Sequence, residues 1–520
     1  MLKMVDGTGI IGVDMVCPLG GTVSPPQPPN YDNVEVEGVG SLMLPNSLKA
    51  PLERLELIGN SVQGENPAPD NPQEIKSAGR KSKNLLIENI SVFTVQDNIA
   101  YIPLPEGHET KLYTMLIQKK PGENDDVGFT CGFYDKSNMT ATYSAPCLQA
   151  GNLVTGNGIV NSKIGVNHFV CFSPADSRFF DIYNVMYAEG KETTLDYEPY
   201  GYLLDVKVTG KNLLDMADIQ NEKGKIDSDF SKAKSIKPFK VIKDRKYLLI
   251  SKGTMIVDVR YSSIYFGEDD LAYGQDSSRK LTTGTGYSCF IGTETRKILV
   301  TKETCTITKT MMHGTRTEKD AYEVEELGLF EIINDNPNID YEPYTEQSMQ
   351  ITLDEPLRGI GEYNDTITKD GVVRKIKRIV FDGSEDEKWT LSNDPKNITT
   401  NRFVIRMNII NAYYKMFTMC NKMAWKHMNQ VDVVGQSTHG VNFYITLPKD
   451  LAPDLQTFIT WLSQNPLTVD YVLAEPVTEP LPESVQQQLQ ALHSENGTTH
   501  VFVDSGEVPC GIKLTYRKEK

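Results

Sequence analysis

The chain has 520 residues, of which 39% are hydrophobic and 23% are charged, an ordinary composition for a globular protein. One hydrophobic core rarely organises so long a chain, so we expect several domains. The formal net charge of −16 argues against sequence-independent binding to nucleic acid, which needs a dense face of lysine and arginine. No apolar run reaches the roughly 18 residues of a membrane span. The first residues lack a signal-peptide pattern, so we expect synthesis in a cytoplasm and no membrane insertion.

Residues 1–82 are interpreted as an N-terminal arm and attachment segment. The stretch VSPPQPPNYDNVEVEGVGS at residues 23–41 is rich in proline, which cannot continue a helix or a central strand. Residues 7–12 match the phosphate-binding pattern G-x-G-x-x-G, but prolines and glycines follow in place of the helix that this pattern requires. The match therefore does not indicate a cofactor.

The strongest signal of organisation is an internal repeat within residues 83–345. The opening phrase KNLL occurs at residues 83–86 and again at 211–214, and the closing phrases LDYEPY and IDYEPY end at Tyr200 and Tyr344. Apolar residues then alternate with polar ones, at 204, 206 and 208 after the first phrase and at 349, 351 and 353 after the second. Such alternation is typical of a half-buried strand. The repeat indicates that one folded module was used twice.

Between the opening and closing phrases, the sequence predicts short strands separated by turn residues. They fall at residues 112–118, 128–134, 167–172 and 179–187 in the first copy, and at 246–251, 254–265, 296–300 and 305–310 in the second. Strands at this spacing, without a long amphipathic helix, favour an antiparallel sandwich of the jelly-roll kind. We place jelly-roll module 1 at residues 83–210 and module 2 at 211–368. The closing phrase is interpreted as a lid that packs its tyrosines against each sandwich.

Residues 369–520 have a different character and predict a mixed α+β domain. The stretch IKRIVF is typical of a strand. Apolar residues at 451, 455, 458, 459 and 462 follow helical spacing, with Asp450 as the expected N-cap and Asn465 and Pro466 as the end. A second helix is predicted to open at Pro482. The whole chain is thus expected to be mainly β, with two tandem jelly-roll β-sandwiches, an N-terminal arm and a C-terminal α+β domain.

Residues that could carry out chemistry are scattered. The eight cysteines form no C-x-x-C pair and have no histidine at zinc spacing, so we expect reduced thiols packed in cores. The seven histidines are isolated, neighbouring acids are interpreted as solvated loop charges, and no G-x-S-x-G elbow marks a nucleophile. We expect no enzyme activity, no cofactor and no metal site, although calcium held by scattered oxygens stays open.

A sugar-binding site needs exposed aromatic rings beside carboxylates or amides. Tyr134 with Asp135, at the end of a predicted strand in module 1, satisfies this requirement. Tyr261 and Tyr265 do so in module 2. The alternative for each position is a core or turn residue, and it is the more common role for such tyrosines.

Four stretches carry a resemblance to a known family. They are LERLELIGNSVQGENPAPDNPQEIKSAG (residues 52–79), the repeated phrases, ITLDEPLRGIGEYNDTI (351–367) and NPLTVDYVLAEPVTEPLP (465–482). Together they resemble minor structural proteins of tailed bacteriophages of Gram-positive bacteria, of the tail-fibre, baseplate or head-fibre type, with jelly rolls like carbohydrate-binding modules. The resemblance implies a virion protein, assembled in the bacterial host cytoplasm with other virion proteins. It also implies a homo-oligomer, for which fibre proteins suggest a trimer.

The leading hypothesis is a virion structural protein, a fibre or baseplate component, that contributes to adhesion to a host-surface glycan. The alternative is a purely architectural baseplate, capsid-decoration or head-fibre protein with no ligand of its own. A third hypothesis is a hydrolase or depolymerase of the cell wall. The sequence leaves open the tail or capsid location, the ligand and the oligomeric state.

Overall fold

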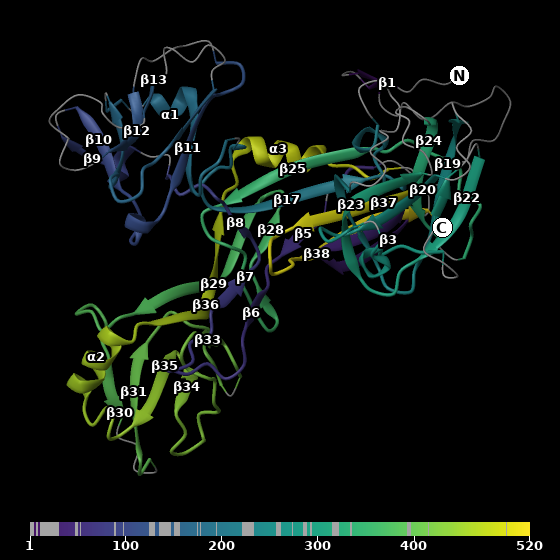
Figure 1. Ribbon diagram of the computed structural model, residues 1–520. Helices are drawn as coiled ribbons and strands as arrows, with labels where there is room; N and C mark the ends of the chain where they lie inside the picture. The colour runs from purple at the N-terminus through teal and green to yellow at the C-terminus, as the bar shows by residue number, and fades with distance from the viewer. Residues whose placement is uncertain are drawn as a thin grey trace.

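The computed structural model describes most of the chain, and in this part the fold is mainly β (Figure 1). It describes residues 5–6, 9–10 and 31–519, apart from residues 47–49, 53, 88–89, 97, 124–129, 135–146, 150–156, 174, 177, 194, 221–232, 256–261, 273, 284–288, 292–293, 315–321, 333–334, 393–396, 414 and 496. The predicted fold class is confirmed.

One antiparallel sheet of 12 strands joins the two ends of the chain, and we call it the scaffold sheet. In spatial order, its strands are β25 (Glu346–Leu353), β17 (Tyr202–Thr209), β37 (Gly497–Asp504), β4 (Ser41–Asn46), β3 (Tyr31–Val39), β38 (Gly511–Glu519), β5 (Leu55–Ile58), β28 (Thr366–Thr368), β29 (Gly371–Phe381), β36 (Leu467–Glu479) and β33 (Thr418–Cys420), with β8 (Arg80–Lys81) beside β17. Strands near the N-terminus thus pair with strands near the C-terminus.

The two strands that follow the closing phrases, β17 and β25, pair with each other. Their alternating apolar residues are all buried, as predicted: Leu204, Val206, Val208, Met349, Ile351 and Leu353. The helix α3 (Glu483–Ala491) opens after Pro482, also as predicted, and packs Leu489 against this core. One face of the scaffold sheet is therefore a hydrophobic core shared by segments from the whole chain.

Three bodies leave the scaffold sheet and return to it: residues 83–200, 211–345 and 382–466. Figure 1 places the first at the upper left, the second at the right and the third at the lower left. This arrangement revises the predicted domain boundaries. From residue 31 onward the expected N-terminal arm supplies β3, β4, β5 and β8 to the sheet, and the expected C-terminal domain supplies β29, β36, β37 and β38. Alternation marks a strand but does not reveal a distant partner, so the sequence could not show these pairings.

Module 1 consists of two facing sheets. The larger has the order β13 (Cys147–Gln149), β12 (Thr130–Tyr134), β15 (Phe169–Ser173), β10 (Ile99–Pro103) and β9 (Thr94–Gln96). The smaller has the order β14 (Asn157–Asn161), β11 (Tyr113–Lys119) and β16 (Tyr183–Glu189). Predicted strand 179–187 is wrong at its start, because the residues of α1 (Phe179–Ile182) form a helical turn packed into the core.

Module 2 repeats this order for every strand except β9, which has no counterpart in the described part of that module. Its sheets are β21 (Cys289–Ile291), β20 (Ser262–Gly267), β23 (Cys305–Gly314) and β18 (Lys234–Val241), and β22 (Glu294–Val300), β19 (Lys246–Met255) and β24 (Tyr322–Glu331). Taken in chain order, the seven strands from β10 to β16 correspond to the seven from β18 to β24. The sequence repeat is therefore a repeat of topology.

The asparagine of each opening phrase explains why that phrase recurs. Asn84 and Asn212 are each 1% exposed. Each side-chain oxygen accepts a hydrogen bond from the backbone N–H two residues later, at 2.9 Å in the first copy and 3.0 Å in the second, forming an Asx-turn. Each amide nitrogen donates to a carbonyl near the end of its module, Val185 or Glu342. The asparagine thus joins the start of the module to its end.

The closing phrases cover the smaller sheet of each module. Tyr197 packs on the outer side of β11 and β16, and Tyr341 packs on the outer side of β19 and β24. Glu198 also accepts hydrogen bonds from the backbone N–H of Lys83 at 2.8 Å and from Arg80 at 2.8 Å. In the second copy, Glu342 forms an ion pair with Lys211. These contacts agree with the structural interpretation for the first tyrosine of each phrase, whereas Tyr200, the second tyrosine of the first copy, is 41% exposed.

The third body, which we call the distal unit, contains a sheet with the order β30 (Thr390–Ser392), β31 (Thr400–Arg406), β35 (Asn442–Pro448), β34 (Gly435–Gly440) and β32 (Ala412–Tyr413). The helix α2 (Leu455–Gln464) packs on this sheet through Phe458, which stacks on Phe403 with ring centroids 3.9 Å apart. Its N-cap is Asp454, which accepts from the Thr457 N–H at 2.8 Å, and not Asp450 as predicted.

The remaining elements are short. They include the hairpins β1 (Val5–Asp6) with β2 (Gly9–Ile10), β6 (Ser61–Gln63) with β7 (Ile75–Ser77), and β26 (Gly359–Ile360) with β27 (Tyr363–Asn364). The short 3-10 helices are η1 (Ile90–Val92), η2 (His108–Thr110), η5 (Met216–Asp218) and η6 (Asp276–Ser278). The β6–β7 hairpin crosses to the base of the distal unit, where Gln63 Nε2 donates to the Cys420 carbonyl at 2.7 Å.

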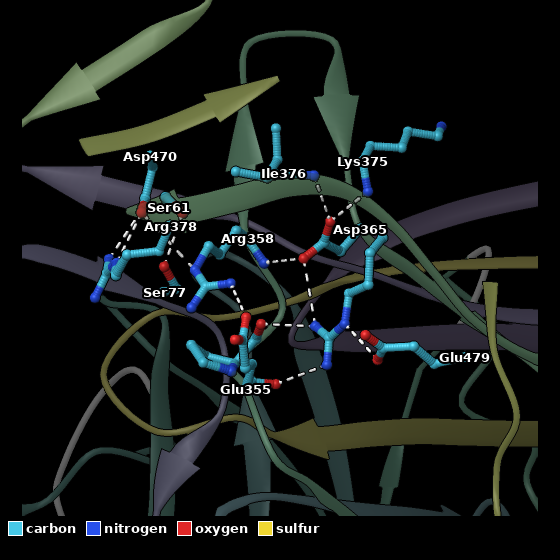
Figure 2. A network of polar contacts seen from close by, with 12 residues as sticks. Ser61, Ser77, Glu355, Arg358, Asp365, Lys375, Ile376, Arg378, Asp470 and Glu479 are labelled. Atoms are coloured by element: carbon cyan, nitrogen blue, oxygen red, sulfur yellow. Dashed lines mark hydrogen bonds and ion pairs between the residues drawn. The ribbon is translucent and has the colours of Figure 1, made fainter. Parts of the chain in front are cut away.

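Buried charges hold the scaffold sheet where the distal unit leaves it. The pairing of β29 with β36 shifts register between Arg374 and Ile376. Asp365, which is 0% exposed, accepts there from the backbone N–H groups of Lys375 at 2.8 Å and Ile376 at 3.0 Å, as Figure 2 shows. The carboxylate thus replaces ladder partners that the bulge removes. Burial raises the pKa of Asp365, against the opposing effect of its backbone donors and of Arg374.

A second buried carboxylate lies close by. Asp470 is 0% exposed and accepts hydrogen bonds from Nε and Nη2 of Arg378, at 2.7 and 2.9 Å (Figure 2). Arg378 also donates to the Ile75 carbonyl at 2.9 Å, which attaches the β6–β7 hairpin. Such a bidentate pair fixes the geometry of both side chains. Since each buried charge has partners from another strand, we assign this network a structural role.

Replacing Asp365 with Asn is expected to destabilise the protein by about 3–5 kcal/mol, because it removes one of the two carboxylates that pair with the buried Arg374 and turns one acceptor oxygen into an amide donor that faces other donors. All three tryptophans, Trp389, Trp425 and Trp461, lie in the distal unit, so urea unfolding followed by their fluorescence measures the effect at its base. The matched control is Asp370→Asn, an exposed position, with an expected change within about 0.5 kcal/mol. Equal unfolding curves for the two variants would contradict the assignment.

Candidate functional site

The outer face of the larger sheet of module 1 carries a row of aromatic side chains. Alternate positions of β10, β12 and β15 point into the core, so Tyr101, Tyr134 and Phe169 lie on the opposite face. Tyr134 and Phe169 are direct cross-strand partners. Tyr101 and Phe169 meet edge to face, with ring centroids 5.5 Å apart. All three side chains are half-buried, so the row offers apolar edges together with tyrosine hydroxyls.

A pair of histidines lies at the end of this row. His168 precedes Phe169, and its backbone N–H donates to the Tyr134 carbonyl at 2.7 Å. Its Nδ1 lies 2.7 Å from Nε2 of His108. His108 Nδ1 lies 3.1 Å from the Pro105 carbonyl, which can only accept, so in neutral His108 the proton is on Nδ1. His168 then donates to His108 and joins two loops of the module.

The corresponding face of module 2 is closed. Tyr265 on β20 is 4% exposed and packs with Leu271 and Met311. The guanidinium of Arg279 lies 3.9 Å from the centre of the Tyr265 ring, a cation–π contact that covers one face. The two modules therefore share a topology and differ at the surface where sugar binding was predicted.

The four predicted sugar-binding residues have different outcomes. Tyr134 is half-buried within the aromatic row. Tyr265 lies in the interior, which is the alternative that the sequence left open, and its ring is not available for stacking. Asp135 and Tyr261 lie outside the described residues. The sequence analysis missed Tyr101 and Phe169, which the alternation of β10 and β15 could have placed on the same face as Tyr134.

A pocket of 450 Å³ lies where module 2 docks on the scaffold sheet, and we call it the junction pocket. Its scaffold side comes from β3, β4, β17 and β37. Its module 2 side comes from β18, from the end of β24 and from neighbouring loop residues. Phe239 and Phe502 are among its apolar lining residues, and Lys207, Arg245 and His500 are among its nitrogen-bearing ones. Pockets between domains are common ligand sites.

The charged groups of the junction pocket differ in how closely an opposite charge lies beside them. Arg245 forms an ion pair with Glu331, whose pKa is raised by burial. Lys207, with 15% of its side chain exposed, has Glu346 at 3.4 Å. Burial lowers the pKa of Lys207 despite that carboxylate. His500 Nε2 is buried and has no hydrogen-bond partner among the described residues. Burial, together with the charge of Arg245, lowers the pKa of His500 to about 4, so its ring is neutral at pH 7.

The far end of the distal unit is a loop supported by buried cations. Asp432, at φ 56°, accepts hydrogen bonds from the N–H groups of Thr399 at 2.8 Å and Thr400 at 3.1 Å. Lys426 is 4% exposed, and its ammonium donates to the Val433 carbonyl. Burial lowers the pKa of Lys426 to about 8, helped by the charge of Arg402. The loop exposes Val431 and Val433 beside Ile398, which is 75% exposed.

Several expectations about chemistry can be compared with the described residues. Five cysteines there stand outside disulfides, and four of them are buried: Cys131, Cys171, Cys420 and Cys510, with Cys305 half-buried. Burial raises the pKa of Cys171 to about 12, so this thiol is protonated and unreactive. In the same part of the chain, no group of three or more His, Cys, Asp or Glu could hold a metal ion. Within it, no helix is long and apolar enough to cross a membrane.

Comparisons with known proteins give no family. No family model matches the chain, and no curated protein sequence matches it. Among solved structures, "Structure of infectious bursal disease virus Gx strain" aligns at 8% identity over 95% of this chain and 84% of that chain, with a TM-score of 0.10. The T13 particle of the same virus aligns at 8% identity over 96% of this chain and 81% of that chain, with a TM-score of 0.11. At these TM-scores the likeness carries no argument about fold or function.

The lowered pKa of Lys426 predicts a pH-dependent contribution to stability. Between about pH 8 and the ordinary value of 10.5, the unfolded chain holds a proton that the folded chain lacks, so stability rises with pH. From pH 7.5 to pH 9.5 the wild type should gain roughly 2 kcal/mol more than Lys426→Met, measured by urea unfolding with tryptophan fluorescence. Lys388→Met, in the same unit, should keep the wild-type slope. Parallel pH profiles for wild type and Lys426→Met would contradict the assignment.

Proposed function

We propose that this chain is a non-enzymatic structural protein of a virus particle that presents module 1 for adhesion to a host-surface glycan. The observation that carries the proposal is the repeated topology of two sandwiches that leave neighbouring, mutually paired strands of one scaffold sheet. This architecture displays one kind of module twice from a rigid base. The resemblance of the sequence to phage minor structural proteins supports the same role, with assembly in the bacterial cytoplasm and other virion proteins as partners.

Module 1 is the better candidate for the adhesive part. Its aromatic row, Tyr101, Tyr134 and Phe169, is half-buried rather than sealed, and sugar rings present C–H faces that pack on aromatic rings. Single sites of this kind bind weakly, so a homo-oligomer, such as the expected trimer, would raise avidity through simultaneous contacts. The acidic net charge favours a neutral glycan over a polyanionic cell-wall polymer.

The second candidate function is purely architectural, and module 2 favours it. Its corresponding face is closed by Arg279 over Tyr265, and the module docks on the scaffold sheet. A chain in which both modules serve only as packing surfaces would show no sugar-dependent binding. A cell-wall hydrolase is a third hypothesis, for which release of reducing sugar from host envelopes is the test.

A glycan array probed with the full chain should give saturable binding that free sugar displaces. Tyr134→Ala and Phe169→Ala should each weaken this binding about tenfold or more, since loss of roughly 1.4 kcal/mol corresponds to one factor of ten. Tyr413→Ala is the matched control, because this tyrosine of the distal unit is 53% exposed and lies outside the row. No saturable binding by the wild type would favour the architectural function, and equal losses in all three variants would contradict the assignment of the sugar site to the aromatic row.

A further inference from the structure

We propose that the junction pocket binds a small carboxylate with an apolar body, held between Lys207 and His500 of the scaffold sheet and the apolar wall of module 2. The proposal is independent of glycan adhesion by module 1. It assigns the pocket a ligand class, monovalent amphipathic acids, and it makes the ligand a contact between two bodies of the molecule.

The position of the two polar groups follows from strand pairing. On β17 and β37, Thr209 lies opposite His500, and Lys207 lies opposite Phe502. Lys207 and His500 are therefore diagonal neighbours on the same face of the scaffold sheet, within reach of one bound group. This is the face opposite the hydrophobic core, because the neighbouring residues along the two strands, Val206, Val208 and Val501, point into that core.

Each of these two groups lacks something that a carboxylate would supply. Lys207 is a largely buried cation with only long contacts, to Glu346 at 3.4 Å, a carboxylate that it shares with Lys237, and to the Pro238 carbonyl at 3.5 Å. His500 has a buried Nε2 without a partner in the described part of the chain. One oxygen of a carboxylate can accept from the ammonium while the other accepts from an Nε2–H, and hydrogen bonds to charged groups are the stronger kind.

The other residues that line the pocket disfavour a ligand with more than one negative charge. Glu37 and Glu331 also line it, beside Lys240 and Arg245, so the lining has little excess positive charge. A phosphate would meet these two carboxylates without the cluster of arginines that binds a doubly charged group. The apolar walls, Met43, Leu213, Phe239 and Phe502, instead match a hydrocarbon or aromatic body. The volume of 450 Å³ falls within the range of small-molecule sites.

Binding would stabilise the docked arrangement of module 2. The proposed carboxylate contacts come from β17 and β37, whereas Phe239 belongs to β18 of the module. A ligand that touches both sides binds only while they are together, so it favours that state by mass action.

The test uses the full chain with benzoate as the probe and benzyl alcohol as its uncharged counterpart of similar shape. Calorimetry should give saturable benzoate binding with Kd at or below about ten millimolar, and at least tenfold weaker binding of benzyl alcohol. In NMR spectra of histidine-labelled protein, the ring signal of His500, assigned with His500→Phe, should move with the same Kd. Inorganic phosphate should not move it.

Two variants and a control complete the test. Lys207→Met keeps the length of the side chain and removes its charge, and His500→Phe removes the ring nitrogens, so each should weaken benzoate binding at least tenfold. Lys111→Met, which removes an exposed lysine of module 1, should bind like the wild type. Benzoate binding that is absent, that benzyl alcohol equals, or that leaves the His500 signal unmoved overturns the proposal. These outcomes are measured on the wild type, so they test the proposal even if a variant fails to fold.

Discussion

The pairing of the two ends of the chain within one sheet is the constraint on which the rest of the structure depends. β3 pairs with β38 along its whole length, and β4 pairs with β37. Between these ends, β17 and β25 complete one side of the sheet, and β29 and β36 complete the other. The three outer bodies leave from strands that are fixed only when these distant pairings exist. Their positions follow from the scaffold sheet and not from direct succession along the chain.

The two modules show how one topology can serve two purposes. Their strands follow the same order, and the same asparagine turn and closing phrase hold each module together. Their surfaces differ, since module 1 keeps a half-buried aromatic row and module 2 covers Tyr265 with Arg279. Module 2 also shares the junction pocket with the scaffold sheet. Duplication therefore supplied two similar frames, and substitutions at outward-facing positions gave them different contacts.

Features set by local chemistry could be predicted from the sequence. The alternation at Val206 and Ile351 identified strands with one buried face, the repeated phrases identified the modules, and Pro482 marked the start of α3. The start of the preceding helix, α2, was harder to predict, because Asp450 and Asp454 are both acceptable caps by residue type and only the backbone geometry selects Asp454. The candidate sites were harder to predict from the sequence, since the partners of Tyr134 and Lys207 come from strands far away in the sequence.

The long stretch of chain between β3 and β4 and their partners β37 and β38 has a consequence for the order of synthesis. A ribosome completes modules 1 and 2 long before it releases the strands that β3 and β4 need. Each module has its own hydrophobic core, whereas the scaffold core must wait for β37 and β38. Until then β3 and β4 have unpaired edges, which are prone to wrong pairing. The pairing of β3 and β4 with their late partners joins segments far apart in the sequence, and such non-local pairing is slow because the loop entropy is lost before the contacts form.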